Sequence, residues 1–533
     1  MKSRAVWLVA GGVLGCGLLA DATWGAFERQ RILGLLRGQF ISEDLQEAVT
    51  NIQRIYSTLI CDIKTNGTGD RHPFLVNILL LNTIHEKEAT TLGGIGAYKV
   101  RQNGSQSKKR KLSCTHRRKP CVKETLVTDA ARYMLFASSA YGLLLLKGLN
   151  ILPKEAGWPP LHKLSSAELD RWCVQKHTGV ADTDLRKVSL ADQPSLHLPG
   201  HFLAVDHATK SVVLSVRGTW SLQDALTDLQ ADTVDFLGGK AHKGIAQSAA
   251  ILWSECGDQV KEELLQHPGY RLVITGHSLG GGTAILLSLM LLSAASPVGV
   301  NVPVECFAFA PPPVFGPLAA APRAAAKHVH SFVYRNDLVP RLSLANALSL
   351  LTALKEVDEL PATLRQRFSY IVKEMRPTVS VEDDGLGTVG VRIGLRYANK
   401  VKEGGWMIGD SDHPISEHLE DIMGKEGECM AGAGESAAML YDCLNIPGQV
   451  LYLNKLGEEC NKETLAKEYG ILCRQKEGGP AFTLEDVDPA TFDKILVTDS
   501  MLVDHWPRWY ENALQGLLDE EESPRAVNGQ AAQ

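Results

Sequence analysis

The feature that most constrains the fold of this chain is the pentapeptide Gly-His-Ser-Leu-Gly at residues 276–280. It follows the apolar run at residues 272–274 and precedes an apolar, helix-like stretch at residues 283–292. A Gly-x-Ser-x-Gly turn between a strand and a helix holds its serine in a strained corner, and the glycines let neighbouring backbone approach closely. The bare pattern is common, so the flanking strand and helix are what predict a nucleophile elbow at Ser278 rather than an ordinary glycine turn.

Hydrogen-bond donors for an oxyanion are predicted at two places beside this serine. Residues 211–216 read as a buried strand that runs into Arg-Gly-Thr at residues 217–219, where a backbone N–H and the Thr219 hydroxyl can donate. The second donor is the backbone N–H of Leu279, directly after the nucleophile. Without the elbow, residues 217–219 would be interpreted as a simple exit from a strand into a turn.

The predicted acid of a catalytic triad is Asp337. Residues 330–334 read as a strand, and an acidic side chain just past the end of a strand suits the residue that orients the base. The alternative is a solvated turn aspartate. Three competing acids stand at helical spacing on what reads as a polar face, namely Asp224, Asp228 and Asp232.

The predicted base is His505. In α/β-hydrolases the chain order is serine, acid and then histidine, which leaves His413, His418 and His505 as candidates. His505 follows a candidate strand at residues 494–497 and precedes a predicted terminal helix at residues 508–518. His413 lies in a glycine-rich run with no convincing strand ahead of it, so the order and the flanking elements favour His505.

Seven segments carry a family resemblance and occur in the expected order. They are residues 129–142, 202–219, 242–244, 276–283, 309–312, 336–343 and 446–451. With these segments the chain resembles the class 3 lipases, and within that family the sn-1-specific diacylglycerol lipases, over about residues 126–345 and 440–518. The resemblance implies an α/β-hydrolase fold, a mostly parallel sheet with flanking helices. It also implies the triad Ser278, Asp337 and His505 with an oxyanion hole at Thr219 and Leu279.

The resemblance further implies an activity, which is hydrolysis of the sn-1 ester of diacylglycerol to 2-monoacylglycerol and a fatty acid through an acyl-enzyme. This mechanism requires no cofactor, and calcium enters only through the resemblance. A triacylglycerol or phospholipid lipase of the same family is the alternative, because the motifs indicate the chemistry and not the head group. A non-catalytic lipid-binding protein is a further alternative, which the presence of all three triad residues disfavours.

The amino-terminal segment reads as a membrane anchor. Residues 5–20 carry no charge and would form about 24 Å of helix, slightly short of a ~30 Å hydrocarbon core, which an extension to residue 27 would span. Basic residues precede the run and small residues follow it, so a cleaved signal peptide is the alternative, with secretion as its consequence. The resemblance favours a single-pass anchor at residues 1–27 with a cytosolic catalytic domain that works at the membrane surface on diacylglycerol or a related glycerolipid.

Composition limits the remaining choices. A chain of 533 residues, 44% of them hydrophobic, exceeds the roughly 250–300 residues at which one core stops growing, so a hydrolase domain with additions is expected. A net charge of −6 gives no indication of a nucleic-acid partner. Eleven cysteines without a compact spacing favour a reducing compartment, whereas the sequons at Asn66 and Asn103 point the other way.

The predicted organisation has five parts. An anchor or signal peptide at residues 1–27 is followed by a juxtamembrane helical segment with a basic loop, and a polar, disordered tail ends the chain at residue 533. The hydrolase domain is interrupted by an insertion that begins with an amphipathic helix at residues 346–375 and is a candidate gate over the site. The remaining bounds are residues 28–125 for the juxtamembrane segment, 126–345 and 446–519 for the hydrolase domain, 346–445 for the insertion and 520–533 for the tail.

The basic loop holds two clusters, at residues 108–111 and 117–119. Each charge would gain about 1 kcal/mol beside an anionic leaflet, while a nuclear-localisation signal and a solvated loop are the alternatives. Cys114, His116 and Cys121 lie close together, but three ligands at irregular spacing do not make a zinc site, so no metal is predicted.

Overall fold

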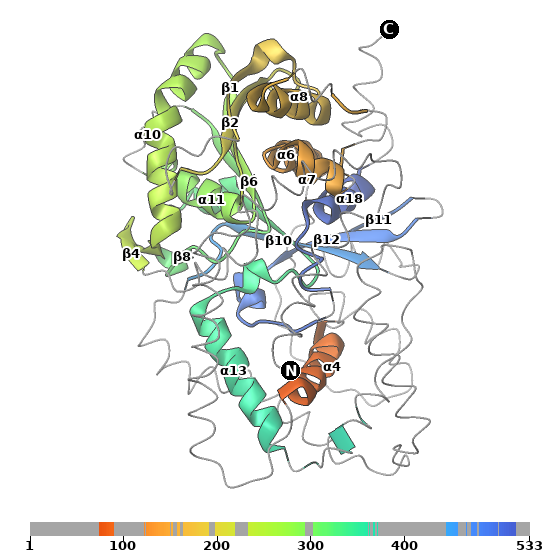
Figure 1. Cartoon of the computed structure of the whole chain (residues 1–533). Helices are drawn as coiled ribbons and strands as arrows, with labels where there is room; N and C mark the ends of the chain where they lie inside the picture. The colour runs from red at the N-terminus through yellow and green to blue at the C-terminus, as the bar shows by residue number, and fades with distance from the viewer. Residues whose placement is uncertain are drawn as a thin grey trace. The chain divides into compact units, whose positions relative to one another are not determined.

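The computed structural model describes two compact units of the chain (Figure 1). One unit comprises Met1–Ile84, Ser221–Thr227 and Leu351–Glu428, and the second comprises His85–Trp220, Asp228–Leu350 and Cys429–Gln533. The described residues are 74–89, 122, 124–149, 151–152, 157–159, 164–190, 198–218, 233–293, 302–360, 362, 366–367, 370, 444–456, 465, 471–476, 479–498 and 500–518. The predicted anchor, the basic loop with its cysteines, the glycine-rich part of the insertion and the tail therefore lie outside the described residues.

In the described part of the chain, a group of α-helices is followed by a group of strands, and helices and strands then alternate. The α-helices are α4 (Phe74–Ala89), α6 (Glu124–Ser139), α7 (Gly142–Gly148), α8 (Ser166–Thr178), α10 (Lys243–Gln266), α11 (Leu279–Leu291), α12 (Ala325–His328), α13 (Leu344–Glu359) and α18 (Pro507–Leu517). The strands are β1 (Leu185–Ser189), β2 (His201–Asp206), β3 (Ser211–Val216), β4 (Thr233–Phe236), β5 (Gly239–His242), β6 (Arg271–His277), β7 (Val304–Phe309), β8 (Phe315–Gly316), β9 (Val329–Tyr334), β10 (Gln449–Leu456), β11 (Leu472–Gln475) and β12 (Ala481–Val487).

A nine-stranded sheet is the centre of the second unit, in the order β1-β2-β3-β6-β7-β9-β10-β12-β11. Strands β3, β6, β7, β9 and β10 are parallel to their neighbours in this series, and antiparallel strands complete both edges. The carboxyl ends of the five parallel strands therefore lie side by side at one end of the strands, which is where such folds assemble a site. The prediction of a mostly parallel sheet with flanking helices, as in an α/β-hydrolase, is confirmed.

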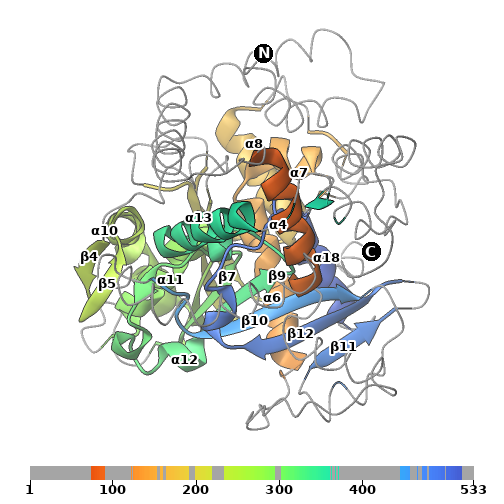
Figure 2. The ribbon, with the colours of Figure 1, turned by 90° about the horizontal axis from the view of Figure 1, so that it is seen from below.

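The two faces of the sheet are covered by different helices (Figure 1). Side chains alternate along each parallel strand, so Cys306 and Ala308 of β7 pack with α10 and α11, while Phe307 and Phe309 pack with α6 and α18. Figure 2 shows α11 and α6 beside the same central strands from a second direction. Because both faces are covered, strands β3, β6 and β9 are almost entirely buried and are mostly apolar, as is typical of parallel strands.

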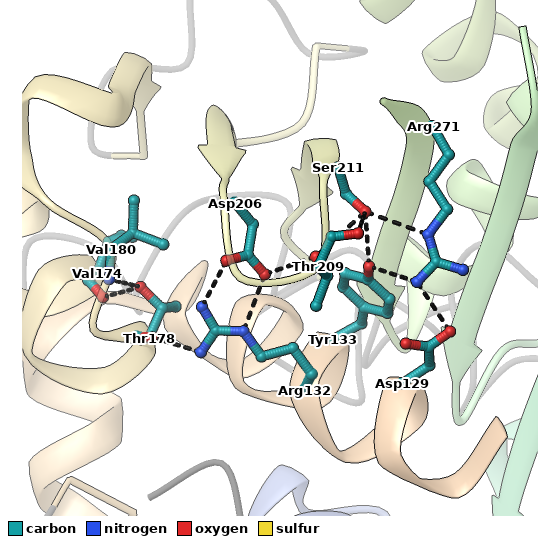
Figure 3. Close-up of polar contacts among 10 residues, drawn as sticks. All are labelled: Asp129, Arg132, Tyr133, Val174, Thr178, Val180, Asp206, Thr209, Ser211 and Arg271. Carbon is teal, nitrogen blue, oxygen red and sulfur yellow. Dashed lines mark hydrogen bonds and ion pairs between the residues drawn. The ribbon is translucent and has the colours of Figure 1, made fainter. Parts of the chain in front are cut away.

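A polar network joins α6 to the end of the sheet at which the parallel strands begin (Figure 3). Arg132 of α6 forms a two-pronged ion pair with Asp206 at the end of β2, with N···O distances of 2.9 and 3.0 Å. Arg271 at the start of β6 donates to Asp129, which lies about one helical turn from Arg132 in α6, at 2.8 Å, and to the Tyr133 hydroxyl at 3.0 Å. These charge-assisted bonds fix the position of α6 on the sheet.

A buried arginine organises the described part of the first unit. The Arg367 side chain is fully buried and donates to the Asn77 side chain at 2.9 Å and to the carbonyl of Leu360 at 2.9 Å. Asn77 in turn donates to Asp358 at 2.6 Å. Within this unit, one guanidinium therefore joins α4 to the carboxyl end of α13.

Two predicted elements differ from the structure. The amphipathic helix predicted at residues 346–375 is α13, which ends at Glu359, because the residue before Pro361 disfavours the helical conformation. Residues 494–497 are not a strand: the place beside β10 in the sheet is occupied by β12, and the Val497 N–H donates to the His85 ring at 2.9 Å instead of to a neighbouring strand. In the part of the chain that the structure describes, no helix has the length and apolarity needed to cross a membrane.

Candidate active site

The nucleophile elbow lies between β6 and α11. Ser278 has φ of 58° and ψ of −131°, a conformation that L residues rarely adopt. A Cβ added to Gly280 would lie 2.2 Å from the Val216 carbonyl oxygen, and one added to Gly276 would lie 2.5 Å from the backbone of Gly280. Only glycine fits at these two positions, so the motif brings the end of β3 against the serine, as the sequence predicts.

His505 lies within hydrogen-bond distance of both other predicted triad residues, Ser278 and Asp337. The Oγ atom of Ser278 is 3.0 Å from Nε2 of His505, and both carboxylate oxygens of Asp337 are 3.0 Å from Nδ1 of His505. Asp337 is fully buried, whereas the His505 side chain keeps 16% of its exposure. The carboxylate can therefore orient the ring without contact with solvent, while the ring edge beside the serine can reach a substrate.

Two further donors hold the Asp337 carboxylate in place. The Val339 N–H donates to Oδ1 at 2.9 Å, and the Tyr510 hydroxyl donates to Oδ2 at 2.6 Å. The Tyr510 oxygen itself accepts the Tyr334 N–H at 2.9 Å. Burial, with the Asp337 charge beside it, raises the pKa of Tyr510 well above its ordinary value, so the hydroxyl stays protonated and remains a donor.

A second histidine, His277, contacts the main chain of the candidate base. His277 is buried, its Nε2 lies 2.9 Å from the main-chain oxygen of His505, and its Nδ1 lies 2.8 Å from the Tyr141 hydroxyl. A carbonyl oxygen can only accept, so Nε2 carries the proton and Nδ1 accepts from Tyr141. Burial lowers the pKa of His277 well below its ordinary value, and the His505 ring nearby adds to the effect. The His277 ring is therefore a neutral bridge between Tyr141 and the backbone of the base.

Helix α18, which begins two residues after His505, is attached to the core by a buried pair of side chains. The Glu511 carboxylate lies 2.8 Å from Nε2 of His177 on α8, and both groups are almost fully excluded from solvent. The Ser138 hydroxyl of α6 donates to the same carboxylate. These contacts position the helix that brings Tyr510 to the triad.

The predicted oxyanion donors are only partly within the described residues. Leu279 is the first residue of α11, so its N–H belongs to the amino-terminal turn whose N–H groups have no partner in the helix. Strand β3 leads to Gly218, where an added Cβ would lie 3.1 Å from the Ser278 Cβ. Thr219 follows immediately and lies outside the described residues, so its role stays a prediction. His413 and His418 also lie outside them.

Sequence reasoning did not single out Tyr141, His277 or Tyr510 as site residues. Tyr141 and His277 stand inside segments that carried the family resemblance, and Tyr510 stands in the predicted terminal helix. Their contacts join residues far apart in the chain, which periodicity and spacing do not reveal. Within the described ranges, no group of three or more His, Cys, Asp or Glu side chains could hold a metal ion.

This arrangement has the chemistry of nucleophilic acyl transfer. A serine hydroxyl bonded to an imidazole, which is oriented by a buried carboxylate, can attack an ester carbonyl. The helix N-terminus beside the serine supplies a positive dipole end and N–H donors for the negative charge that develops on the carbonyl oxygen.

Comparisons with known proteins agree with this chemistry. The family model described as lipase (class 3) matches residues 213–347. Diacylglycerol lipase-alpha of Homo sapiens is 37% identical over 282 residues, which cover 46% of this chain and 26% of that protein. Diacylglycerol lipase-beta of Mus musculus is 36% identical over 182 residues, 32% of this chain and 26% of that protein. The secreted mono- and diacylglycerol lipase A of Penicillium camembertii is 32% identical over 146 residues, 27% of this chain and 46% of that protein.

The matched region contains the elbow and the candidate acid, and the candidate base follows it in the chain order of α/β-hydrolases. The chain spans about a quarter of the length of the two diacylglycerol lipases that it matches. Residues 213–347 therefore match the class 3 lipases, and the chain is similar to the diacylglycerol lipases.

Proposed function

We propose that this protein is a serine lipase that hydrolyses the sn-1 ester of diacylglycerol, releasing a fatty acid and a 2-monoacylglycerol. The observation that carries the proposal is the contact of Ser278 with His505 and of His505 with Asp337, each at 3.0 Å. A chain that only bound lipid would have no need for a strained serine beside an oriented histidine.

The proposed reaction proceeds in two steps. His505 takes the proton of the Ser278 hydroxyl as the serine oxygen attacks the ester carbonyl, and the N–H of Leu279 with Thr219 holds the oxyanion. His505 then gives that proton to the departing glycerol oxygen, which leaves the acyl group on the serine. Water attacks the acyl-enzyme with His505 again as base, the fatty acid leaves, and Ser278 recovers its proton.

The substrate class rests on the names of the similar proteins, several of which are diacylglycerol lipases. A panel of diacylglycerol, triacylglycerol and phospholipid with purified protein, and with the products identified by mass spectrometry, tests it. We expect 2-monoacylglycerol from diacylglycerol and no product with Ser278→Ala. If the protein cleaves triacylglycerol or phospholipid and leaves diacylglycerol intact, the head-group assignment is wrong and only the lipase class remains.

We also propose that residues 1–27 attach the protein to a membrane, because residues 5–20 are free of charge and apolar. Deletion of residues 1–27 should move the protein to the soluble fraction and lower activity on bilayer diacylglycerol. Hydrolysis of a short soluble ester should stay nearly unchanged, because no proposed catalytic group lies in the segment. Equal loss on both substrates would show that the segment belongs to the folded catalytic domain.

The insertion is proposed to gate the site, because a long segment inside a compact domain is typical of a lid. Shortening residues 376–440 should raise activity on the soluble ester and leave membrane partitioning unchanged. Lower activity on the soluble ester would exclude a gate.

A further inference from the structure

The acid and the base of the candidate triad stand on two loops that are bonded to each other. The acid loop is residues 335–338, directly after β9, and the base loop is residues 500–505, directly before α18. The Leu338 N–H donates to the Met501 carbonyl at 3.1 Å. Since Asp337 and His505 meet only where these loops meet, whatever joins the loops determines the geometry of the triad.

The Asp504 carboxylate provides a side-chain connection between the loops, beside the contact of the Asn336 amide with the Ser500 hydroxyl at 3.5 Å. It accepts the Asn336 N–H at 3.2 Å and the Ser500 hydroxyl at 2.6 Å, and it lies 3.4 Å from the Arg335 guanidinium. Asp504 therefore contacts Asn336, which precedes the acid Asp337 in the acid loop. Asp504 itself precedes the base His505 in the base loop. Asp504 is only 3% exposed.

Burial makes this carboxylate unfavourable for stability when it is ionised. Desolvation raises the pKa of Asp504 to about 6, although Arg335, Ser500 and the Asn336 N–H act in the opposite direction. The charged or titratable groups that face it are Arg335, Asp337, Tyr334, Tyr452 and Tyr510. A folded-state pKa above the ordinary value means that folding favours the protonated form, so stability is lost as the pH rises through about 6. At neutral pH the ionised Asp504 therefore lowers the stability of the fold, so a contribution to stability is not the reason for an aspartate at this position.

We propose that Asp504 is a positioning residue, whose ionised carboxylate holds the acid loop against the base loop and so keeps Asp337 in reach of His505. The inference rests on the proposed function of these residues. Protonation replaces one acceptor oxygen with a hydroxyl group, which weakens the bond to the Asn336 N–H and removes the attraction to Arg335. Hydrolysis should then depend on two protonation events as the pH falls, one at the base and one at Asp504.

Asp504→Asn tests this, because it keeps the size of the side chain and removes the charge. With a short soluble ester at pH 8, we expect kcat to fall about tenfold while KM stays within about twofold, because Asp504 contacts no substrate group. On the acid side of the profile of log kcat/KM against pH, the slope should be greater than 1 in the wild type, as for more than one proton. In the variant the slope should be about 1, as for a single proton. The melting temperature at pH 8 should be equal to or higher than that of the wild type. Ser500→Ala, which removes one of the bonds to Asp504, should give a smaller fall in kcat.

Asp206→Asn is the matched control. Asp206 is also a buried aspartate with an arginine partner, Arg132 (Figure 3), but it lies beside Ser211, where β3 begins, at the end of the strands far from the site. This variant should melt at a lower temperature than the wild type and keep the wild-type kcat and the wild-type slope on the acid side.

Three results would overturn the proposal. The first is an Asp504→Asn variant with the kcat of the wild type and the same slope of log kcat/KM at acid pH. The second is a loss of both kcat and melting temperature in that variant. The third is the same change of slope in Asp206→Asn. Failure of the proposed function is distinguishable, because the wild type would then neither hydrolyse the soluble ester nor react at Ser278 with a fluorophosphonate probe.

Discussion

His277 donates a hydrogen bond from Nε2 to the main-chain oxygen of His505, at 2.9 Å. His277 directly precedes the candidate nucleophile, and His505 is the candidate base. The bond therefore joins the elbow to the base loop at the main chain of His505, and it does not involve the reacting atoms. The base thus has two supports, a carboxylate on its ring and a neutral imidazole on its carbonyl.

Replacing His277 should impair turnover without removing any group of the triad. In His277→Phe, we expect kcat on a soluble ester to fall by ten- to a hundredfold, because the His505 backbone loses its donor while the ring volume is nearly kept. Tyr141→Phe should cost less, since it leaves the bond to His505 in place. Steady-state kinetics with thermal melting measures both effects. A Tyr141→Phe variant slower than His277→Phe would contradict this account of the bridge.

Substitution of Ser278 should separate activity from stability. Ser278→Ala and Ser278→Gly should both lose ester hydrolysis and labelling by a fluorophosphonate probe. Glycine accepts a φ of 58° without strain and alanine does not, so the glycine variant should unfold with a free energy higher by about 1 kcal/mol. Chemical denaturation checks the difference. Labelling that persists in either variant would move the nucleophile to another residue.

The choice of base can be tested against its sequence competitor. His505→Ala should lower kcat by about three orders of magnitude or more, because the serine loses its proton acceptor. His413→Ala should change kcat by less than about twofold, the range expected for a residue outside the chemistry. The opposite pattern in a kinetic comparison of the two variants would assign the base to His413.

Stability at acid pH should depend on His85. Burial lowers the pKa of His85 from 6.5 to about 3, and the positive charges of Lys494 and Arg341 add to the effect. The folded state therefore binds a proton less readily than the unfolded chain, so His85 favours folding above pH 6.5 and this contribution is lost as the pH falls toward 3.

His85→Gln keeps an acceptor for the Val497 N–H and removes the titration. Its free energy of unfolding should fall less steeply than that of the wild type between pH 6 and pH 5, by up to about 1.4 kcal/mol per pH unit. Urea denaturation at several pH values measures this slope. Parallel curves for the two proteins would show that His85 titrates normally in the fold.

Three of the parallel strands of the central sheet could be predicted from the sequence. The runs at residues 211–216, 272–274 and 330–334 correspond to β3, β6 and β9, because strands buried on both faces leave a mostly apolar pattern. Residues 494–497 leave the same pattern without a strand. Their side chains are partly or fully buried, but their backbone bonds to a distant histidine, and no local pattern distinguishes these two cases.

The candidate triad follows from motif and chain order, whereas its supports do not. Ser278 is marked by its flanking glycines, and the acid and base follow from their order along the chain. Tyr510, His277 and Asp504 act through contacts between segments far apart in the chain, and each residue type has many ordinary roles. Only the packing of α18 and of the two loops distinguishes them. Thr219, outside the described residues, stays a prediction from its place after β3.

Strand β10 lies beside β9 in parallel register from Gln449 opposite His330 to Leu453 opposite Tyr334, although the whole predicted insertion separates them in the chain. The nucleophile and the acid precede that insertion, and the base follows it. A cut within residues 376–440 would therefore give two polypeptides, neither with a complete triad, joined by the ladder between these strands. Ester hydrolysis by the cut protein would report reassembly of the two pieces, which makes this domain a natural candidate for a split-enzyme sensor.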